Sequence, residues 1–475
     1  MSRIAVRANT RRSTVVMASR PHTHLAPHKP IRLTTDSYLS NVFTNLPLEH
    51  RLRVIPLPTT AVSADTPAQR CRDARRRGDE ERMEAGPSSD PVREFFLPEL
   101  PRSLPWRYHP RAAQIEFASN GWVREYLSDC FSSESELLFF LRQRNGLYGP
   151  LTVPDADARR ARDVADWYQF VTVIDTFVSD RTGLGANLAD ARAVFAAIIG
   201  DFIPEQPQGD ETRSTPVRPG ETRPSETRPD QARDDQARTD QARVDQVAYG
   251  RAARDLWERI STGLSRAQTG RLVAALAAFL RGCATEIDAK LAGTVPDYET
   301  CLAVRLDSFG CDFIELMTEY GAEVDLSDIV AELAAVHDHC RRQMIIINDL
   351  LSWRKEHAQN DPMTVVRVLV EHDGLALQPA VDQLCGLVAW HEREYARARD
   401  ELLAGPLGAR DDIRRYLGAL DLLMGGSQEF EYLTPRYFGD GFVWDGATSG
   451  WVDLYAPVTR FRPDPWESVR SLECL

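Results

Sequence analysis

The chain has 475 residues, enough for one large domain with appendages or for two domains. Its formal net charge of -13 at pH 7 argues against a nucleic-acid-binding surface, because such surfaces are basic. Hydrophobic residues make up 43% of the chain, which suffices for a large core, yet no apolar run approaches the ~18 residues that span a bilayer. The eight cysteines have no paired spacing, which is typical of reduced core thiols in a cytoplasmic protein.

The N-terminal segment, residues 1–92, differs from the rest of the chain. It is basic up to the first acidic residue, Asp36, and contains many serines and threonines. This composition is typical of an organellar transit peptide and also of a disordered basic tail, and we favour the tail. We expect one folded domain over 93–461 and a short tail over 462–475.

The folded part reads as helical. Prolines and apolar residues in Phe95–Pro101 predict an extended strap that lies on a globular body. From Pro110 onward apolar residues recur at helical spacing and strand-like alternation is scarce, so the predicted fold class is all-α. Irregular structure is predicted after residue 437. Helices are predicted over about 156–179, 252–291, 326–359 and 411–430.

A low-complexity insert occupies residues 203–247. Glu-Thr-Arg begins at 211, 221 and 226, and Asp-Gln-Ala-Arg begins at 230, 235 and 240. Balanced charge, prolines and the lack of an apolar face exclude a packed core here. We expect a disordered linker inside the helical domain, without a direct role in chemistry.

A polar stripe crosses the long helix predicted near residue 350. Asn348, Ser352 and Glu356 stand at i, i+4 and i+8, so they share one face. Their amide, hydroxyl and carboxylate oxygens are hard ligands that suit Mg2+, an ion often shared with substrate phosphates. Lys355 adds a cation that could reach a phosphate. The plain alternative is a solvated helix face, which the apolar Met344–Ile347 run disfavours because it indicates burial.

Two further sets of residues stand out. Asp175 lies on the same helix face as apolar and aromatic residues, whereas Asp180 lies roughly 140° around the helix, so one ion shared by both is not assumed. Gly310 interrupts an apolar helix, at a cost of about 1 kcal/mol against alanine, which often marks a helix break or a ligand contact. Arg305, more than one turn earlier, could meet an anion on the same side.

In combination these features resemble the bacterial-type class I terpene cyclases, over about 95–461 without the insert. The strap, Asp175, Arg305 with Gly310, the polar stripe and the Arg436-Tyr437 pair follow one another in the family's order.

The chain departs from the family's pattern in two places. Thr176 replaces the family's usual second aspartate, so Asp175 would carry the metal binding there. Leu306 stands where many relatives have a second arginine.

The resemblance implies a single helical bundle that ionises an allylic prenyl diphosphate, cyclises the carbocation and releases diphosphate. Farnesyl diphosphate is expected because it is the commonest substrate in the family, and dimers are frequent there. Three Mg2+ ions are implied, with metal ligands Asp175, Asp180, Asn348, Ser352 and Glu356. The implied catalytic and diphosphate-binding residues are Arg305, Gly310, Lys355, Arg436 and Tyr437. Candidates for the pocket wall, each equally well explained as core, are Trp167, Phe170, Phe177 and Phe309.

Other interpretations stay open. A monoterpene or diterpene cyclase would share this fold, and a degenerate homologue that binds an isoprenoid without turnover is supported by Thr176. A chain-elongating prenyltransferase would carry aspartate-rich motifs on both rims, which the polar stripe contradicts. The adjacent His337-Asp338 resembles a metal-dependent phosphohydrolase motif, but such enzymes need further His and Asp ligands on other helices.

Overall fold

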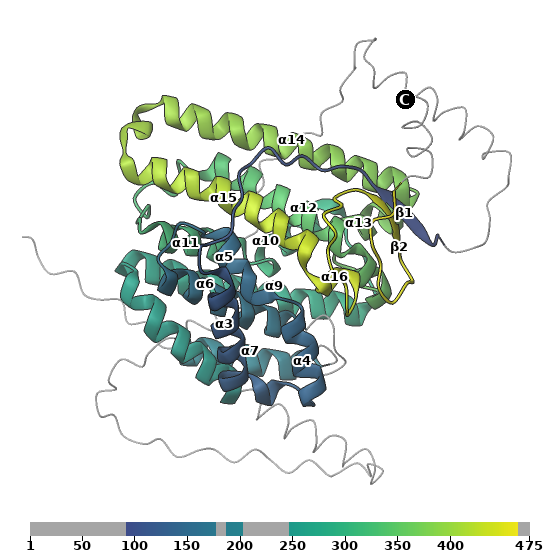
Figure 1. Ribbon diagram of the computed structural model, residues 1–475, viewed down its shortest axis with the longest axis horizontal. Coiled ribbons are helices and arrows are strands. Elements are labelled where there is room, and N and C mark those ends of the chain that lie inside the picture. Colours follow the sequence, from purple (N-terminus) through teal and green to yellow (C-terminus); the bar gives the residue numbers. More distant parts are fainter. Residues whose placement is uncertain (1–91, 177–186, 203–246, 464–475) are drawn as a thin grey trace, which may run out of the picture. The chain divides into compact units, whose positions relative to one another are not determined.

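A computed structural model of the protein describes residues 92–176, 187–202 and 247–463. The predictions for the N-terminal tail, for nearly all of the insert and for the end of the chain lie outside these residues. The described part is almost entirely helical, which confirms the all-α fold class (Figure 1). Its elements are β1 Glu94–Leu97, α3 Ala112–Tyr126, α4 Glu134–Arg142, α5 Tyr148–Thr152, α6 Ala158–Asp175, α7 Leu188–Phe202, α9 Arg266–Ala292, α10 Tyr298–Ser308, α11 Cys311–Ala322, α12 Ala334–Gln359, α13 Val365–Arg367, α14 Leu377–Ala404, α15 Asp411–Leu433, α16 Pro435–Phe438 and β2 Gly450–Asp453.

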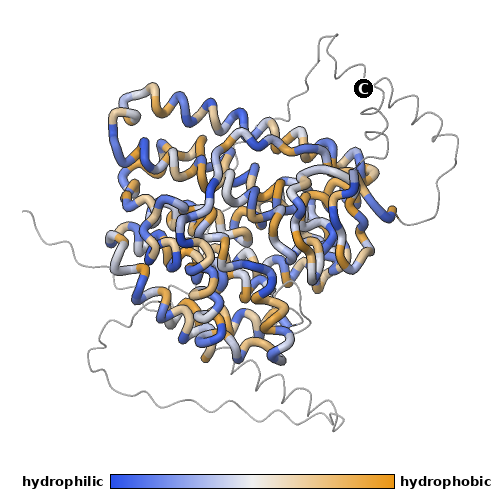
Figure 2. The backbone as a smooth tube through the Cα atoms, viewed as in Figure 1, coloured by the Kyte–Doolittle hydropathy of each residue, from blue (hydrophilic) through white to orange (hydrophobic). Residues whose placement is uncertain are grey.

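Local sequence signals begin and end the helices. Ser265 starts α9 with a capping box, because its hydroxyl accepts from the Gln268 backbone N–H while the Gln268 side chain accepts from the Ser265 N–H. Gly293, in the left-handed conformation, ends the same helix. Hydrophobic and hydrophilic segments alternate along the helices in Figure 2, as expected for helices that each bury one face.

Helix α12 lies at the centre of the packing. It contacts α10, α14 and α15, and the Met344–Ile347 run is buried as the sequence predicts. Helix α9 packs against α10 and α11, while α6 packs against α3 and α5. A helix whose surroundings are apolar on most sides must satisfy any polar side chain it carries, and this applies directly to the polar stripe of α12.

The strap is present and is held from two sides. Strand β1 pairs antiparallel with β2, with Phe95 opposite Val452. On the other side, the Gln378 amide of α14 accepts from the Phe96 N–H at 2.8 Å and donates to the Phe96 carbonyl at 2.9 Å. Figure 1 shows the segment after β1 running beside α14. The β2 strand was not predicted, because the segment after residue 437 was expected to be irregular.

Two helix boundaries were predicted wrongly. Helix α12 begins at Ala334 rather than near 326, and residues 327–333 form turns and a bend instead. The helix expected over 252–291 is divided by a short 3-10 turn, Ser261–Gly263, just before the Ser265 cap.

The cysteines and the membrane prediction have a clear outcome in the described residues. The described residues include six of the eight cysteines, and five of these six are buried. No helix in this part of the chain has the length and apolar character needed to cross a membrane.

The predicted helix break occurs at Gly310. Helix α10 ends at Ser308, α11 starts at Cys311, and Gly310 between them has φ 77°. A Cβ atom on Gly310 would stand only 1.9 Å from the ring of Phe313. The break therefore needs glycine both for its backbone conformation and for the close approach of this ring.

We expect Gly310→Ala to destabilise the protein by more than the about 1–2 kcal/mol that left-handed backbone alone costs an L residue, because the Phe313 ring must also move. Urea denaturation followed by circular dichroism measures the change. Gly418→Ala in α15 is the matched control, since nothing lies within 4 Å of its Cβ position; there alanine should stabilise by up to about 1 kcal/mol. Equal effects of the two substitutions would contradict this account of the break.

Candidate active site

The polar stripe on α12 is buried. Asn348 is 8% exposed, Ser352 0% and Glu356 6%. Ser352 Oγ lies 2.6 Å from both the Asn348 carbonyl oxygen and Glu356 Oε1, so its one proton can serve only one acceptor at a time. Among the described residues no hydrogen-bond donor contacts Glu356 Oε2. Burial, with the nearby Asp349 carboxylate, raises the pKa of Glu356 well above its usual value.

A cation at this stripe would remove that burial penalty. The available atoms are the hard oxygens of an amide, a hydroxyl and a carboxylate, the donor set that suits Mg2+. The described residues contain no group of three or more His, Cys, Asp or Glu side chains arranged for a metal ion, in keeping with a stripe that holds one carboxylate only. The residues therefore fit a magnesium ion that takes its remaining ligands from water and substrate.

The α12 stripe forms one rim of a pocket, and the opposite rim is formed where α6 ends. Asp175 makes an ion pair with Arg436, whose Nη1 also donates to Thr176 Oγ1 at 3.0 Å and to Gln143 Oε1 at 3.3 Å. Arg436 comes from α16, directly after α15, so the arginine of the predicted Arg-Tyr pair meets the predicted aspartate, whereas the Tyr437 hydroxyl accepts from Asn348 Nδ2 at 3.0 Å. Asp180 and Phe177 lie outside the described residues, so their assignments stay predictions.

Arg305 reaches the stripe from α10. Its Nη2 donates to Asn348 Oδ1 at 2.9 Å and to Asp349 Oδ1 at 2.7 Å, while Nη1 lies 3.5 Å from Glu286 Oε1. Asp349 is fully buried and also accepts the Val365 N–H. The guanidinium therefore compensates two carboxylates and touches an amide oxygen of the stripe.

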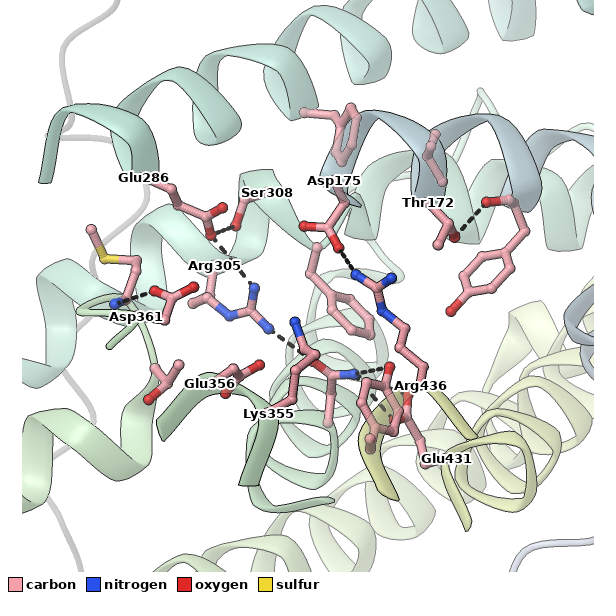
Figure 3. A pocket seen from close by; sticks show the side chains of 18 of the residues that line it. Thr172, Asp175, Glu286, Arg305, Ser308, Lys355, Glu356, Asp361, Glu431 and Arg436 are labelled. Carbon is pink, nitrogen blue, oxygen red and sulfur yellow. Dashed lines mark hydrogen bonds and ion pairs between the residues drawn. The ribbon is translucent and has the colours of Figure 1, made fainter. Parts of the chain in front are cut away.

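Both rims line one pocket, which is open to solvent. In Figure 3, Asp175 and Arg436 face each other on one side, and Glu286, Arg305 and Glu356 gather on the other. The polar lining includes Asp175, Glu286, Arg305, Asn348, Lys355, Glu356, Glu431, Arg436 and Tyr437, and the aromatic lining includes Tyr148, Tyr168, Phe279, Phe309 and Phe313.

The predicted wall residues separate into three groups. Phe309 lines this pocket. Trp167 lines a second, smaller cavity, which shares Tyr148, Tyr168 and Phe313 with the first. Phe170 packs in the core, with its ring 6.3 Å from Trp167 and 6.2 Å from Tyr249, and lines neither cavity.

Some residues of the pocket were not singled out from the sequence. Tyr168 stands seven positions before Asp175, nearly two full helical turns, so helix periodicity favours it over Trp167 at eight positions. Its ring stacks on Tyr148 with centroids 3.8 Å apart. Glu286 and Glu431 gave no signal in the sequence. Burial raises the pKa of Glu431 to about 7, although hydrogen bonds from Asn348 and Tyr437 and the positive charges of Arg305 and Arg436 act to lower it.

The phosphohydrolase interpretation receives no support from the described residues. His337 Nε2 lies 2.8 Å from the Tyr416 hydroxyl and its Nδ1 lies 3.1 Å from Glu315 Oε2. Asp338 pairs with Arg342. These contacts satisfy both residues of the motif inside the bundle, and neither lines the pocket.

Comparison with known proteins gives the class. The family model "Terpene synthase family 2, C-terminal metal binding" matches residues 220–394, a span that contains Arg305 and the polar stripe. Alpha-muurolene synthase from Coprinopsis cinerea is 25% identical over 355 residues, covering 73% of this chain and 74% of that protein. Sesquiterpene synthase Agr3 from Cyclocybe aegerita is 24% identical over 372 residues, covering 75% and 94%.

Solved structures agree on the fold. Germacradien-4-ol synthase from Streptomyces citricolor superposes with a TM-score of 0.55 at 15% identity, covering 70% of this chain and 98% of that one. Linalool/nerolidol synthase from Streptomyces clavuligerus in complex with 2-fluorogeranyl diphosphate gives 0.53 at 21% identity, covering 68% and 100%. The fold is that of the class I terpene synthases. The family model and these relatives support the same class, a terpene synthase, which is a carbon–oxygen lyase acting on phosphates.

We expect Arg305→Met to destabilise the protein by about 3–5 kcal/mol, because removing one partner leaves Asp349 and Glu286 buried without their cation. The matched control is Arg281→Met, whose partner Asp307 is 3.6 Å away and whose side chain is 30% exposed; it should lose less than about 1 kcal/mol. Chemical denaturation of both variants checks this. Similar losses in the two variants would show that the buried ion pairs of Arg305 contribute no more to stability than the exposed pair of Arg281.

Proposed function

We propose that the chain is a Mg2+-dependent sesquiterpene cyclase that ionises farnesyl diphosphate and cyclises the resulting carbocation. The observation that carries the proposal is the buried α12 stripe with an oxygen of Glu356 that lacks a donor, set in one pocket with Asp175, Arg305 and Arg436. A pocket with hard oxygen ligands on two rims and cations between them suits a metal-bound diphosphate.

Four residues of the described chain would hold the metal ions: Asp175 on one rim, and Asn348, Ser352 and Glu356 on the other. Three Mg2+ ions are the number we expect, with Asp180 as a further ligand. When bound, Mg2+ supplies Lewis-acid charge that makes diphosphate a better leaving group. The chain's own task is to present these oxygens from rigid helices, which the burial of the stripe supports.

Cationic and hydroxyl donors would bind the diphosphate itself. Arg305, Lys355, Arg436 and Tyr437 all line the pocket. They would donate to diphosphate oxygens, where negative charge grows as the carbon–oxygen bond breaks. Gly310 lies five residues after Arg305, and its close contact with Phe313 couples this end of α10 to the pocket wall.

The aromatic lining would protect the carbocation. Tyr148 and Tyr168 stack with an interplanar angle of 11°, and Phe430 meets both rings edge-on. Aromatic faces attract cations, and an apolar wall excludes the water that would quench them. This part of the pocket therefore suits chain folding and cyclisation.

The substrate test uses purified protein with Mg2+ and, separately, geranyl, farnesyl and geranylgeranyl diphosphate, with products analysed by gas chromatography and mass spectrometry. We expect a cyclic C15 product from farnesyl diphosphate that disappears with EDTA and in Asn348→Ala. The control Asn187→Ala, at the exposed start of α7, should keep the product. A cyclic product only from a C10 or C20 substrate would contradict the chain length, and no cyclic product from any of the three would favour the degenerate homologue.

Thr176 generates a further prediction. Thr176→Asp adds a second carboxylate beside Asp175, so the Mg2+ concentration for half-maximal turnover should fall roughly three- to tenfold, because affinity rises with ligand charge. Thr176→Asn has similar size without the charge and should leave the requirement near that of the parent chain. Titration of activity with Mg2+ measures both. If only Thr176→Asp were active, the parent chain would be a degenerate site.

A further inference from the structure

Asn348 is held at both ends of its side-chain amide. On one side Arg305 Nη2 donates to Oδ1 at 2.9 Å. On the other side Nδ2 lies 3.1 Å from each carboxylate oxygen of Glu431 and 3.0 Å from the Tyr437 hydroxyl. Asn348 is 8% exposed and Glu431 2%, so water does not compete freely for these contacts.

The two flanking charged groups have opposite hydrogen-bonding polarity. A guanidinium only donates, and an ionised carboxylate only accepts. The amide oxygen must therefore face Arg305 and the amide nitrogen must face Glu431. The reversed amide would lose the bonds to both groups and would place N–H groups against a guanidinium.

This orientation matters for metal binding because the two ends of an amide are not equivalent. Only the oxygen is a ligand for a hard cation such as Mg2+, and the nitrogen would present hydrogens to it. We propose that Glu431 is a positioning residue. It keeps the Asn348 oxygen turned toward the proposed metal site that Asn348 shares with Ser352 and Glu356. The inference rests on the proposed function, since it takes Asn348 as a metal ligand.

The position of Glu431 in the chain adds to its significance. It lies in the last turn of α15, five residues before Arg436 and six before Tyr437. Figure 3 shows Glu431 and Arg436 close together at one edge of the pocket. One short segment would therefore supply two groups for the diphosphate and the group that orients a metal ligand on α12.

The test is Glu431→Gln, which keeps the side-chain size but can donate as well as accept, so Asn348 loses one of the two charged contacts that fix its orientation. Removing a group that orients a metal ligand typically weakens metal affinity about 10–100-fold. We expect the Mg2+ concentration for half-maximal turnover to rise at least about tenfold, while kcat at saturating Mg2+ stays close to that of the parent. As a readout without turnover, the thermal shift produced by Mg2+ with inorganic pyrophosphate should need a similarly higher Mg2+ concentration.

A matched control and a rescue separate positioning from other roles. Glu429→Gln removes another buried carboxylate of α15, the partner of Arg102, and should lower stability without changing the Mg2+ requirement. The double variant Asn348→Asp/Glu431→Gln should bring the requirement back toward the parent value, because both oxygens of Asp at 348 are ligands and the new amide at 431 can donate to it.

Each outcome has a definite meaning. A parent-like Mg2+ requirement in Glu431→Gln would overturn the positioning role. A raised requirement that the double variant does not restore would also overturn it, and would make Glu431 a direct ligand. If the parent protein itself showed neither turnover nor a Mg2+-dependent shift with pyrophosphate, the proposed function would fail and the inference with it.

Discussion

The pocket depends on the mutual compensation of buried charges. Glu286, Asp349, Glu356 and Glu431 are carboxylates withdrawn from water, and burial raises the pKa of each one. Arg305 and Arg436 are the guanidinium groups that face them. Because an unpaired buried charge is far more costly than a paired one, the positions of these side chains constrain the helices that carry them. Ion pairs join α10 to α12, through Arg305 and Asp349, and α16 to α6, through Arg436 and Asp175, in addition to the apolar packing.

This compensation also explains why the two arginines contact polar residues that we propose as metal ligands. Arg436 pairs with Asp175, and Arg305 touches the Asn348 oxygen. Under the proposed function, metal ions would neutralise the oxygens and diphosphate would take over the guanidinium groups. Substrate binding would then exchange one set of ion pairs for another, so the net energetic change can be modest although each interaction is strong.

The sequence predicted what depends on local spacing and missed what depends on tertiary contact. The i, i+4, i+8 stripe of Asn348, Ser352 and Glu356 follows from helix periodicity, and the break at Gly310 follows from the conformational freedom of glycine. Tyr168 could have been found by the same periodicity had the seven-residue spacing from Asp175 been used. Glu431 could not, because its contact with Asn348 joins helices that lie 83 positions apart in the chain. The pairing of β1 with β2 likewise depends on a distant partner rather than on a local pattern.

That pairing has a consequence for the order of folding. Glu94, at the start of β1, pairs with Arg462, which is 368 positions later, and the Arg436-Tyr437 pair lies between these ends and close to the second. Contacts over such long separations form slowly, because the intervening chain must first be brought together. During synthesis the N-terminal strap would therefore wait for nearly the whole domain. The edge of the pocket formed by Arg436 and Tyr437 would be among the last parts to assemble, so a chain interrupted shortly before this edge could fold most of its helices and still lack this part of the pocket.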